Sequence, residues 1–142
     1  MSGAELPSNM LWQTAAAGTD ETDCNVGPAP DETTPTGSNG NCTSNWGVHD
    51  MVGNVWEWVG DWAQSRGSGE GSTNTGGNYG NDLINGIGRI GADFYGNGTQ
   101  AFPMAWIRGG GFGQESNAGV FALFGRVSPA VSVDDVGFRC AK

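Results

Sequence analysis

The sequence predicts an α+β domain in which short antiparallel strands are joined by long irregular loops, with little helix. Its 142 residues match the length of one ordinary domain. Its 26 glycines and 6 prolines interrupt most windows that could otherwise hold a long regular element. Six Trp and six Phe supply the apolar area that a folded core needs. We therefore expect one domain over residues 1–142.

The N-terminal third predicts one short helix followed by a loop. Residues 11–17 end in three good helix formers, and Gly18 is a typical helix stop. Residues 19–45 are rich in Pro, Gly and Asn and show no sustained periodicity. Cys24 and Cys42 both lie in this loop, where a disulfide and two free surface thiols are equally compatible with the sequence.

Four runs with the character of strands follow. We expect strands over residues 55–62, 104–108, 119–124 and 136–141, because each run is short, apolar and bounded by glycine or polar turns. Residues 65–101 read as a long irregular excursion whose apolar islands indicate packing. Cys140, in the final run, is expected to be a buried thiol.

The first strand has a distinctive alternation. Trp56 and Trp58 are two residues apart and are expected on one face of the sheet, with Glu57 on the other. Gly53 permits a tight turn before the strand, and the amide of Asn54 can bond to turn backbone. These residues predict a rigid turn that leads into a buried strand.

Composition excludes several classes of function. Fifteen acidic and six basic residues give a net charge of −9, which opposes binding to nucleic acid or to an anionic membrane surface. No apolar run approaches the about 20 residues that cross a bilayer. Residues 1–7 lack the pattern of a secretory signal, so a surface location would come from assembly or from a fuller chain. Three cysteines and one histidine without a short-spaced pair do not make a tetrahedral zinc site.

Four stretches resemble the formylglycine-generating-enzyme (sulfatase-modifying factor) family. Residues 45–62 are similar to its signature G-x-x-D-M-x-G-N-V-W-E-W, and residues 34–38 to the segment that precedes it. Residues 108–112 and 136–141 are similar to its closing motifs R-G-G-S-W and G-F-R-C-A. The stretches occur in the family's order. The resemblance implies the C-type-lectin fold of that family, with the usual N-terminal portion shortened.

The resemblance also implies a calcium ion near the first signature. Its ligands would be the carboxylates of Asp50 and Glu57 and the carbonyls of Gly53 and Val55. Oxygen ligands suit Ca²⁺, but these four fall short of the six to eight that it prefers. The alternative is a pair of carboxylates that are solvated or paired with arginine. No other cofactor is expected.

The residues required for catalysis are missing. The oxidase activity of the family depends on two reactive cysteines between its closing motifs, and residues 113–136 contain none. Cys140 belongs to the final scaffold motif, and a single histidine cannot build the iron site of the related sulfoxide synthases. We expect no enzyme activity; the alternative is a degenerate or partner-dependent oxidase.

The segment that replaces the catalytic one resembles the variable region of diversity-generating-retroelement proteins, about residues 108–140. Residues 116–123 read as a strand, and the residues around it are expected in exposed turns that share one surface. Such a region mixes aromatic, basic and acidic side chains, as binding surfaces do. The predicted ligand contacts are Gly111, Gly113, Phe124, Arg126, Val127, Val131, Val133, Asp134 and Asp135.

Together these features predict a ligand- or receptor-binding protein with a hypervariable C-terminal surface. The partner would be a protein or glycan on a target cell, and the location a phage or virion tail or a cell surface. Two alternatives stay open: a carbohydrate-binding lectin-like domain without variation, and a structural subunit of an oligomer. The sequence leaves the oligomeric state open.

Overall fold

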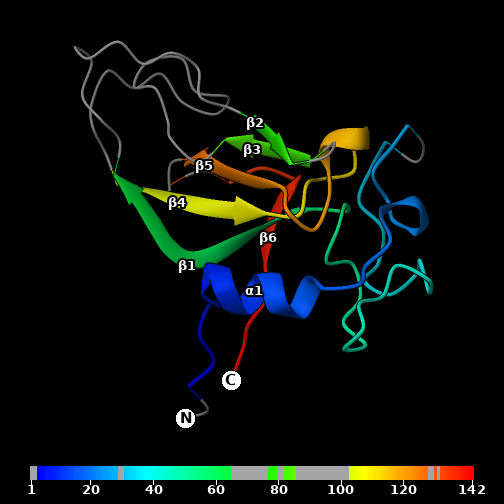
Figure 1. Ribbon diagram of the computed structural model, residues 1–142, viewed down its shortest axis with the longest axis horizontal. Coiled ribbons are helices and arrows are strands. Elements are labelled where there is room, and N and C mark those ends of the chain that lie inside the picture. The colour runs from blue at the N-terminus through cyan, green and yellow to red at the C-terminus, as the bar shows by residue number, and fades with distance from the viewer. Residues whose placement is uncertain are drawn as a thin grey trace.

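The computed structural model describes residues 3–28, 31–64, 77–79, 82–85, 103–127, 130 and 132–142. Irregular chain predominates between short elements (Figure 1). The helical elements are α1 (Asn9–Ala16) and the 3₁₀ turns η1 (Glu21–Asp23) and η2 (Glu115–Asn117). The strands are β1 (Trp56–Gln64), β2 (Gly77–Tyr79), β3 (Asp82–Asn85), β4 (Pro103–Arg108), β5 (Leu123–Val127) and β6 (Val136–Phe138). None of the helical elements in these ranges has the length and apolar character that crossing a membrane requires.

The strands form one six-stranded sheet in the order β2-β3-β5-β4-β1-β6. The pairs β2–β3, β5–β4 and β4–β1 are antiparallel, whereas β3–β5 and β1–β6 are parallel. The expected antiparallel pairing is confirmed for three of these pairs, and the two parallel pairs make the sheet mixed. Parallel neighbours need long connections, and both parallel pairs join strands that are far apart in the sequence. The local sequence of a strand does not show that it will pair with a strand so far away in the chain.

The helix α1 lies against one face of the sheet, beside β1 (Figure 1). It begins two residues before the predicted start because Ser8 caps it: the Leu11 amide donates to the Ser8 hydroxyl at 3.2 Å. It ends just before Gly18, whose φ of +83° confirms the expected stop. The chain ends also meet, since Glu5 and Ala141 form an antiparallel bridge.

The sheet has a hydrophobic cluster on each face. Trp12 of α1 packs against Val59 on the helix side, whereas Trp56 packs with Ile107 on the opposite side. Trp58 joins the second cluster, which confirms that Trp56 and Trp58 share a face. The alternation of β1 thus divides the interior into two layers, as period-two patterning requires.

Three of the four predicted strands are confirmed in place, at β1, β4 and β6. The remaining strand, expected over residues 119–124, starts only at Leu123: residues 119–122 form a turn, closed by a bond from the Ala122 amide to the Gly119 carbonyl at 3.0 Å. The reading of residues 116–123 as a strand is wrong for the same reason, and because η2 extends to Asn117. Cys140 is an exposed free thiol, so the expectation of a buried one is wrong, because β6 ends at Phe138. Of the apolar islands in residues 65–101, Leu83 and Ile84 lie in β3; the others fall outside the described residues.

A disulfide joins Cys24 and Cys42, with a Cα–Cα distance of 4.8 Å and a sequence separation of 18. It resolves the two possibilities that the sequence left open. Cys42 is fully buried, and its carbonyl accepts a bond from the Asp50 amide at 3.0 Å. The bridge therefore fastens the loop after α1 to the segment that enters β1.

We predict that replacing both bridged cysteines, Cys24→Ala with Cys42→Ala, lowers the free energy of unfolding by about 3 kcal/mol. A cross-link of this span removes roughly that much loop-closure entropy from the unfolded chain. Urea denaturation would measure the change. Cys140→Ala is the matched control, because its thiol is free and exposed; an equal loss in that variant would contradict the prediction.

Candidate functional site

The turn before β1 bonds to the segment that follows β4. Gly53 has a φ of +72°, and a Cβ added there would lie 2.7 Å from the carbonyl carbon of Asn25. Its amide donates to the Gly109 carbonyl at 3.3 Å. The Asn54 carbonyl accepts the Phe112 amide at 3.0 Å. The first signature and the Arg-Gly-Gly motif are therefore held together backbone to backbone.

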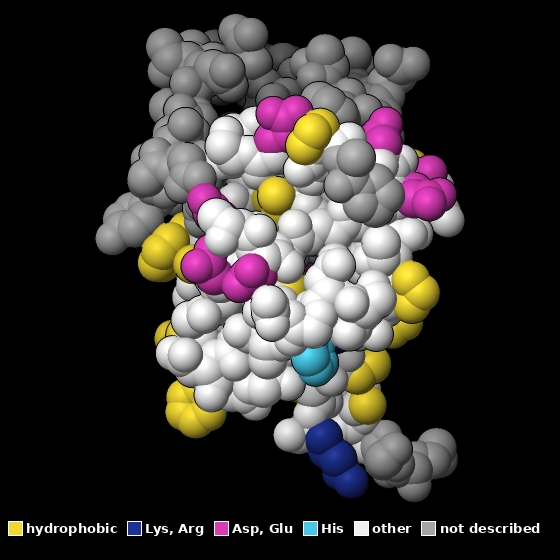
Figure 2. All heavy atoms as spheres, turned by 90° about the vertical axis from the view of Figure 1, so that its right-hand side faces the viewer, with side chains coloured by type: hydrophobic (Ala, Val, Ile, Leu, Met, Phe, Trp, Pro, Cys, Tyr) yellow, Lys and Arg dark blue, Asp and Glu magenta, His cyan; other side chains and the backbone are white. Residues whose placement is uncertain are grey.

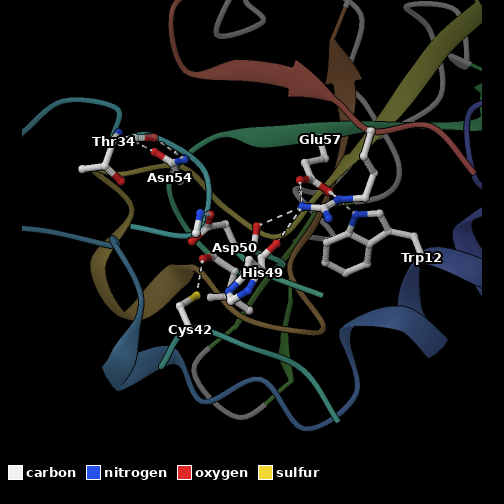
Figure 3. Close-up of polar contacts among 10 residues, drawn as sticks. Trp12, Thr34, Cys42, His49, Asp50, Asn54 and Glu57 are labelled. Atoms are coloured by element: carbon white, nitrogen blue, oxygen red, sulfur yellow. Dashed lines mark hydrogen bonds and ion pairs between the residues drawn. The ribbon is translucent and has the colours of Figure 1, made fainter. Parts of the chain in front are cut away.

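Asn54 also bonds through its side chain, as the sequence predicted. Its Oδ1 accepts the amide of Thr34 at 2.8 Å, and its Nδ2 donates to the carbonyl of the same residue at 3.0 Å (Figure 3). The Asn54 side chain thus satisfies both the backbone N–H and the C=O of Thr34, as a neighbouring strand would. This pair of bonds fixes the preceding loop against the turn.

The glycines after β4 permit close contact between segments. Gly109 has a φ of +91°, and a Cβ there would lie 2.8 Å from the Met51 carbonyl oxygen. Gly110 has a φ of +87° and lies directly against Ala118. Both positions require glycine because the conformation is left-handed and the space is already filled.

Glu57 lies at the centre of a buried polar network. It is 5% exposed, and its Oε2 accepts Trp12 Nε1 and Arg139 Nε, each at 2.6 Å (Figure 3). Its Oε1 accepts Nη2 of Arg139 in an ion pair. That guanidinium also donates to the carbonyls of His49 and Asp50, each at 3.2 Å. Side chains from α1, β1 and the C-terminal segment therefore meet at one carboxylate.

Both carboxylates of the predicted calcium site already have hydrogen-bond partners in the protein. The Asp50 carboxylate is 5% exposed and accepts the Gly37 amide at 2.6 Å. The Glu57 carboxylate faces the Arg139 guanidinium, which would repel a cation, and the carbonyl donors would come from Gly53 and Val55. The described residues hold no group of three His, Cys, Asp or Glu that could bind a metal. This arrangement favours the arginine-paired alternative, and calcium binding stays a prediction for a Ca²⁺ titration.

We predict that Glu57→Gln lowers the free energy of unfolding by about 2–3 kcal/mol, because it leaves the Arg139 charge without its partner. The loss is smaller than for a fully buried pair, since the Arg139 side chain is 25% exposed. Urea denaturation would measure it. Asp134→Asn, at an exposed carboxylate, is the control and should change stability little. Equal effects would contradict the role given to the network.

Three of the predicted ligand contacts meet at Trp56. The Phe124 ring lies 6.0 Å from the Trp56 ring, centroid to centroid. A Cβ at Gly111 would lie 3.4 Å from Trp56 Cδ1 and 3.7 Å from the Cβ of Asp135. The Trp56 amide donates to the Asp135 carbonyl at 2.8 Å. Gly111 is buried and Phe124 is half-buried in the second hydrophobic cluster, which differs from the exposed turns expected.

The other predicted contacts divide into two groups. Gly113 and Asp134 are exposed, and Val133 is half-buried. Arg126 and Val127 lie in β5, an internal strand between β3 and β4, so their expected placement in turns is wrong. Their side chains, and Val131 as a whole, lie outside the described residues. The strand continues because β5 pairs with a neighbour on both sides.

Val26 and Asp31, from the N-terminal half of the chain, border the predicted surface, which the sequence did not indicate. A Cβ at Gly113 would lie 3.8 Å from Asp31 Oδ1. The Glu115 amide donates to the Val26 carbonyl at 2.6 Å. Figure 2 shows the face of these irregular loops, with Asp and Glu side chains spread over its upper part; among the described residues it shows, Lys and Arg colour appears only at the lower edge. More than eighty positions separate the two segments, so no local pattern could relate them.

The chain is similar to several solved structures. Four variants of the Major Tropism Determinant, P3c, U1, M1 and I1, each align at a TM-score of 0.63 and 26% identity, over 95% of this chain and 32% of theirs. Treponema denticola variable protein 1 aligns at 0.59 and 22% identity, over 96% of this chain and 46% of its own. CarF aligns at 0.57 and 20% identity, over 98% and 47%. The chain thus spans about a third to a half of the length of these proteins.

The comparison with protein families agrees with the motifs. A search of curated proteins finds no match. The family profile described as a sulfatase-modifying factor enzyme 1-like domain matches residues 1–142. The resemblance to a variable protein with the fold of the formylglycine-generating enzymes is thereby confirmed, as is the fold class. The chain belongs to the family of sulfatase-modifying factor enzyme 1-like domains.

Proposed function

We propose that this protein binds a ligand or receptor without catalysing a reaction, through a C-terminal surface that a retroelement diversifies. The observation that carries the proposal is the likeness to the Major Tropism Determinant variants over 95% of the chain. A determinant of tropism acts by recognition. We extend recognition to this chain because its corresponding segment, residues 113–136, contains no cysteine to carry the family's oxidase chemistry.

The structure of the predicted surface supports recognition. Gly113 and Asp134 are exposed on irregular chain, whereas their flanking segments are tied to the scaffold by backbone bonds, such as that from the Trp56 amide to the Asp135 carbonyl. Side chains can change on such chain while the backbone stays in place. A rigid surface also loses little conformational entropy when it binds a partner.

The partner would be a protein or glycan on a target cell, reached from a phage or virion tail or from a cell surface. The disulfide between Cys24 and Cys42 supports an oxidising location of this kind. The net charge of −9 favours partners that are neutral or basic over nucleic acid. We propose that binding needs no cofactor.

The DNA beside the gene tests the retroelement part of the proposal. We expect a near-copy of the segment that encodes residues 108–140, with adenines where the gene differs, next to a reverse transcriptase gene. Sequencing of the flanking region would detect it. Absence of such a copy would contradict diversification and leave the lectin-like alternative.

We predict that exchange of exposed side chains leaves the fold intact. Substitutions at Gly113 and Asp134 should change the free energy of unfolding by about 0.5 kcal/mol or less, because surface positions carry little packing. Substitutions to alanine at the buried controls Met51 and Val52 should cost about 2–5 kcal/mol and 1–3 kcal/mol. Protease resistance of displayed variants would measure both sets. Comparable losses in the two sets would contradict a variable surface.

A degenerate or partner-dependent oxidase remains the second candidate, favoured by the family match and the likeness to CarF. The described part of the chain has one free cysteine, Cys140, which is exposed and lies after β6. Incubation with a sulfatase-type cysteine peptide, followed by mass spectrometry, separates the candidates. We expect unchanged peptide, and conversion to formylglycine would overturn the binding proposal.

A further inference from the structure

We infer that Arg108 is a positioning residue, which holds the backbone leading into β5 in place whatever side chains that segment carries. The inference rests on the proposed function, because it concerns how the variable segment is presented. Arg108 is the last residue of β4 and is 3% exposed. It lies at the junction between the scaffold motif Arg-Gly-Gly and the region predicted to vary.

The guanidinium of Arg108 donates to three successive carbonyls. Its Nη1 bonds to the carbonyls of Phe121 at 3.1 Å and Ala122 at 2.8 Å, and its Nη2 to that of Val120 at 3.3 Å. We call these contacts the carbonyl clamp. The turn that it holds is also closed by backbone bonds, including the Gly109 amide to the Ala122 carbonyl at 3.3 Å. Leu123, the first residue of β5, follows directly.

The guanidinium is itself fixed from the scaffold side. It lies over the Trp12 ring at 4.8 Å from the centroid, and its Nη2 also donates to Gln13 Oε1. Trp12 in turn donates to Glu57, which pairs with Arg139. Residues outside the predicted variable contacts thus orient the guanidinium of Arg108. Lysine cannot replace it, because a lysine ammonium neither stacks as a plane on a ring nor offers a fork of donors.

The clamp bonds to the backbone of the turn. The three hydrogen bonds from Arg108 to residues 120–122 end on carbonyl oxygens, so these bonds do not depend on which side chains the three residues carry. Phe121 is 40% exposed on this turn, while Ala122 is fully buried. These bonds therefore fix the path of the backbone without specifying the side chains that the turn exposes. A segment whose side chains are exchanged requires this.

Amide hydrogen exchange tests the clamp without any ligand. In Arg108→Lys, the Gly119 and Ala122 amides should exchange about tenfold to hundredfold faster, because charge-assisted bonds to the turn are lost. The amides of Thr34 and Cys42, which bond to Asn54 and Asn39, should change far less. Arg139→Lys is the matched control: it weakens the pair with Glu57 at the other end of the network and should leave the turn protected. Equal acceleration in the turn and at Thr34 and Cys42, or none in the turn, would overturn the inference.

A second variant keeps the test open if Arg108→Lys does not fold. Gln13→Ala removes a scaffold partner of the guanidinium and should produce the same local acceleration at Ala122 to a smaller degree. Unchanged protection there would count against the clamp.

A displayed library separates failure of this inference from failure of the proposed function. Codons for Gly113, Val133 and Asp134 would be randomised in chains with Arg108 and in chains with Arg108→Lys, and protease-resistant variants counted. We expect a several-fold larger resistant fraction with Arg108. Equal, high fractions in both would overturn the clamp alone, whereas a low fraction even with Arg108 would contradict the variable surface.

Discussion

The backbone junction between residues 53–54 and 109–112 is the constraint on which the rest of the structure depends. Two bonds, from the Gly53 amide to the Gly109 carbonyl and from the Phe112 amide to the Asn54 carbonyl, bring the start of β1 against the end of β4. The left-handed glycines at this crossing leave no space for side chains. Because both strands leave from it, the junction sets the register of the central pair β1–β4, and with it the two hydrophobic layers.

The scaffold and the turn before β5 use different kinds of polar contact. The scaffold uses bonds that specify side chains, such as those of Asn54 to residue 34 and of Glu57 to Trp12 and Arg139. Replacing one member of such a set leaves a buried partner unsatisfied, which is costly. The turn before β5 uses bonds to backbone carbonyls instead. This difference explains how one domain combines a core that is sensitive to substitution with a segment that tolerates it.

The predicted binding surface is less simple than a rim of exposed turns. Phe124 contributes to the core beside Trp56, so any substitution there acts on packing as well as on recognition. Gly113 and Asp134 lie free of that restriction, at positions exposed to solvent. A loop from the N-terminal half, marked by Asp31, reaches the same surface and adds acidic character. Recognition would therefore combine variable and scaffold residues.

The sequence by itself determined the elements that depend on local chemistry. The stop at Gly18, the alternation of Trp56 and Trp58 and the turn at Gly53 all follow from backbone freedom or a period of two, and each is confirmed. The parallel pairings, the start of β5 at Leu123 and the exposure of Cys140 were decided only in the tertiary structure. Residues 119–122 have the apolar character of a strand, but Arg108, distant from them in the sequence, holds their carbonyls in a turn. Contacts between remote segments leave no trace in a local pattern.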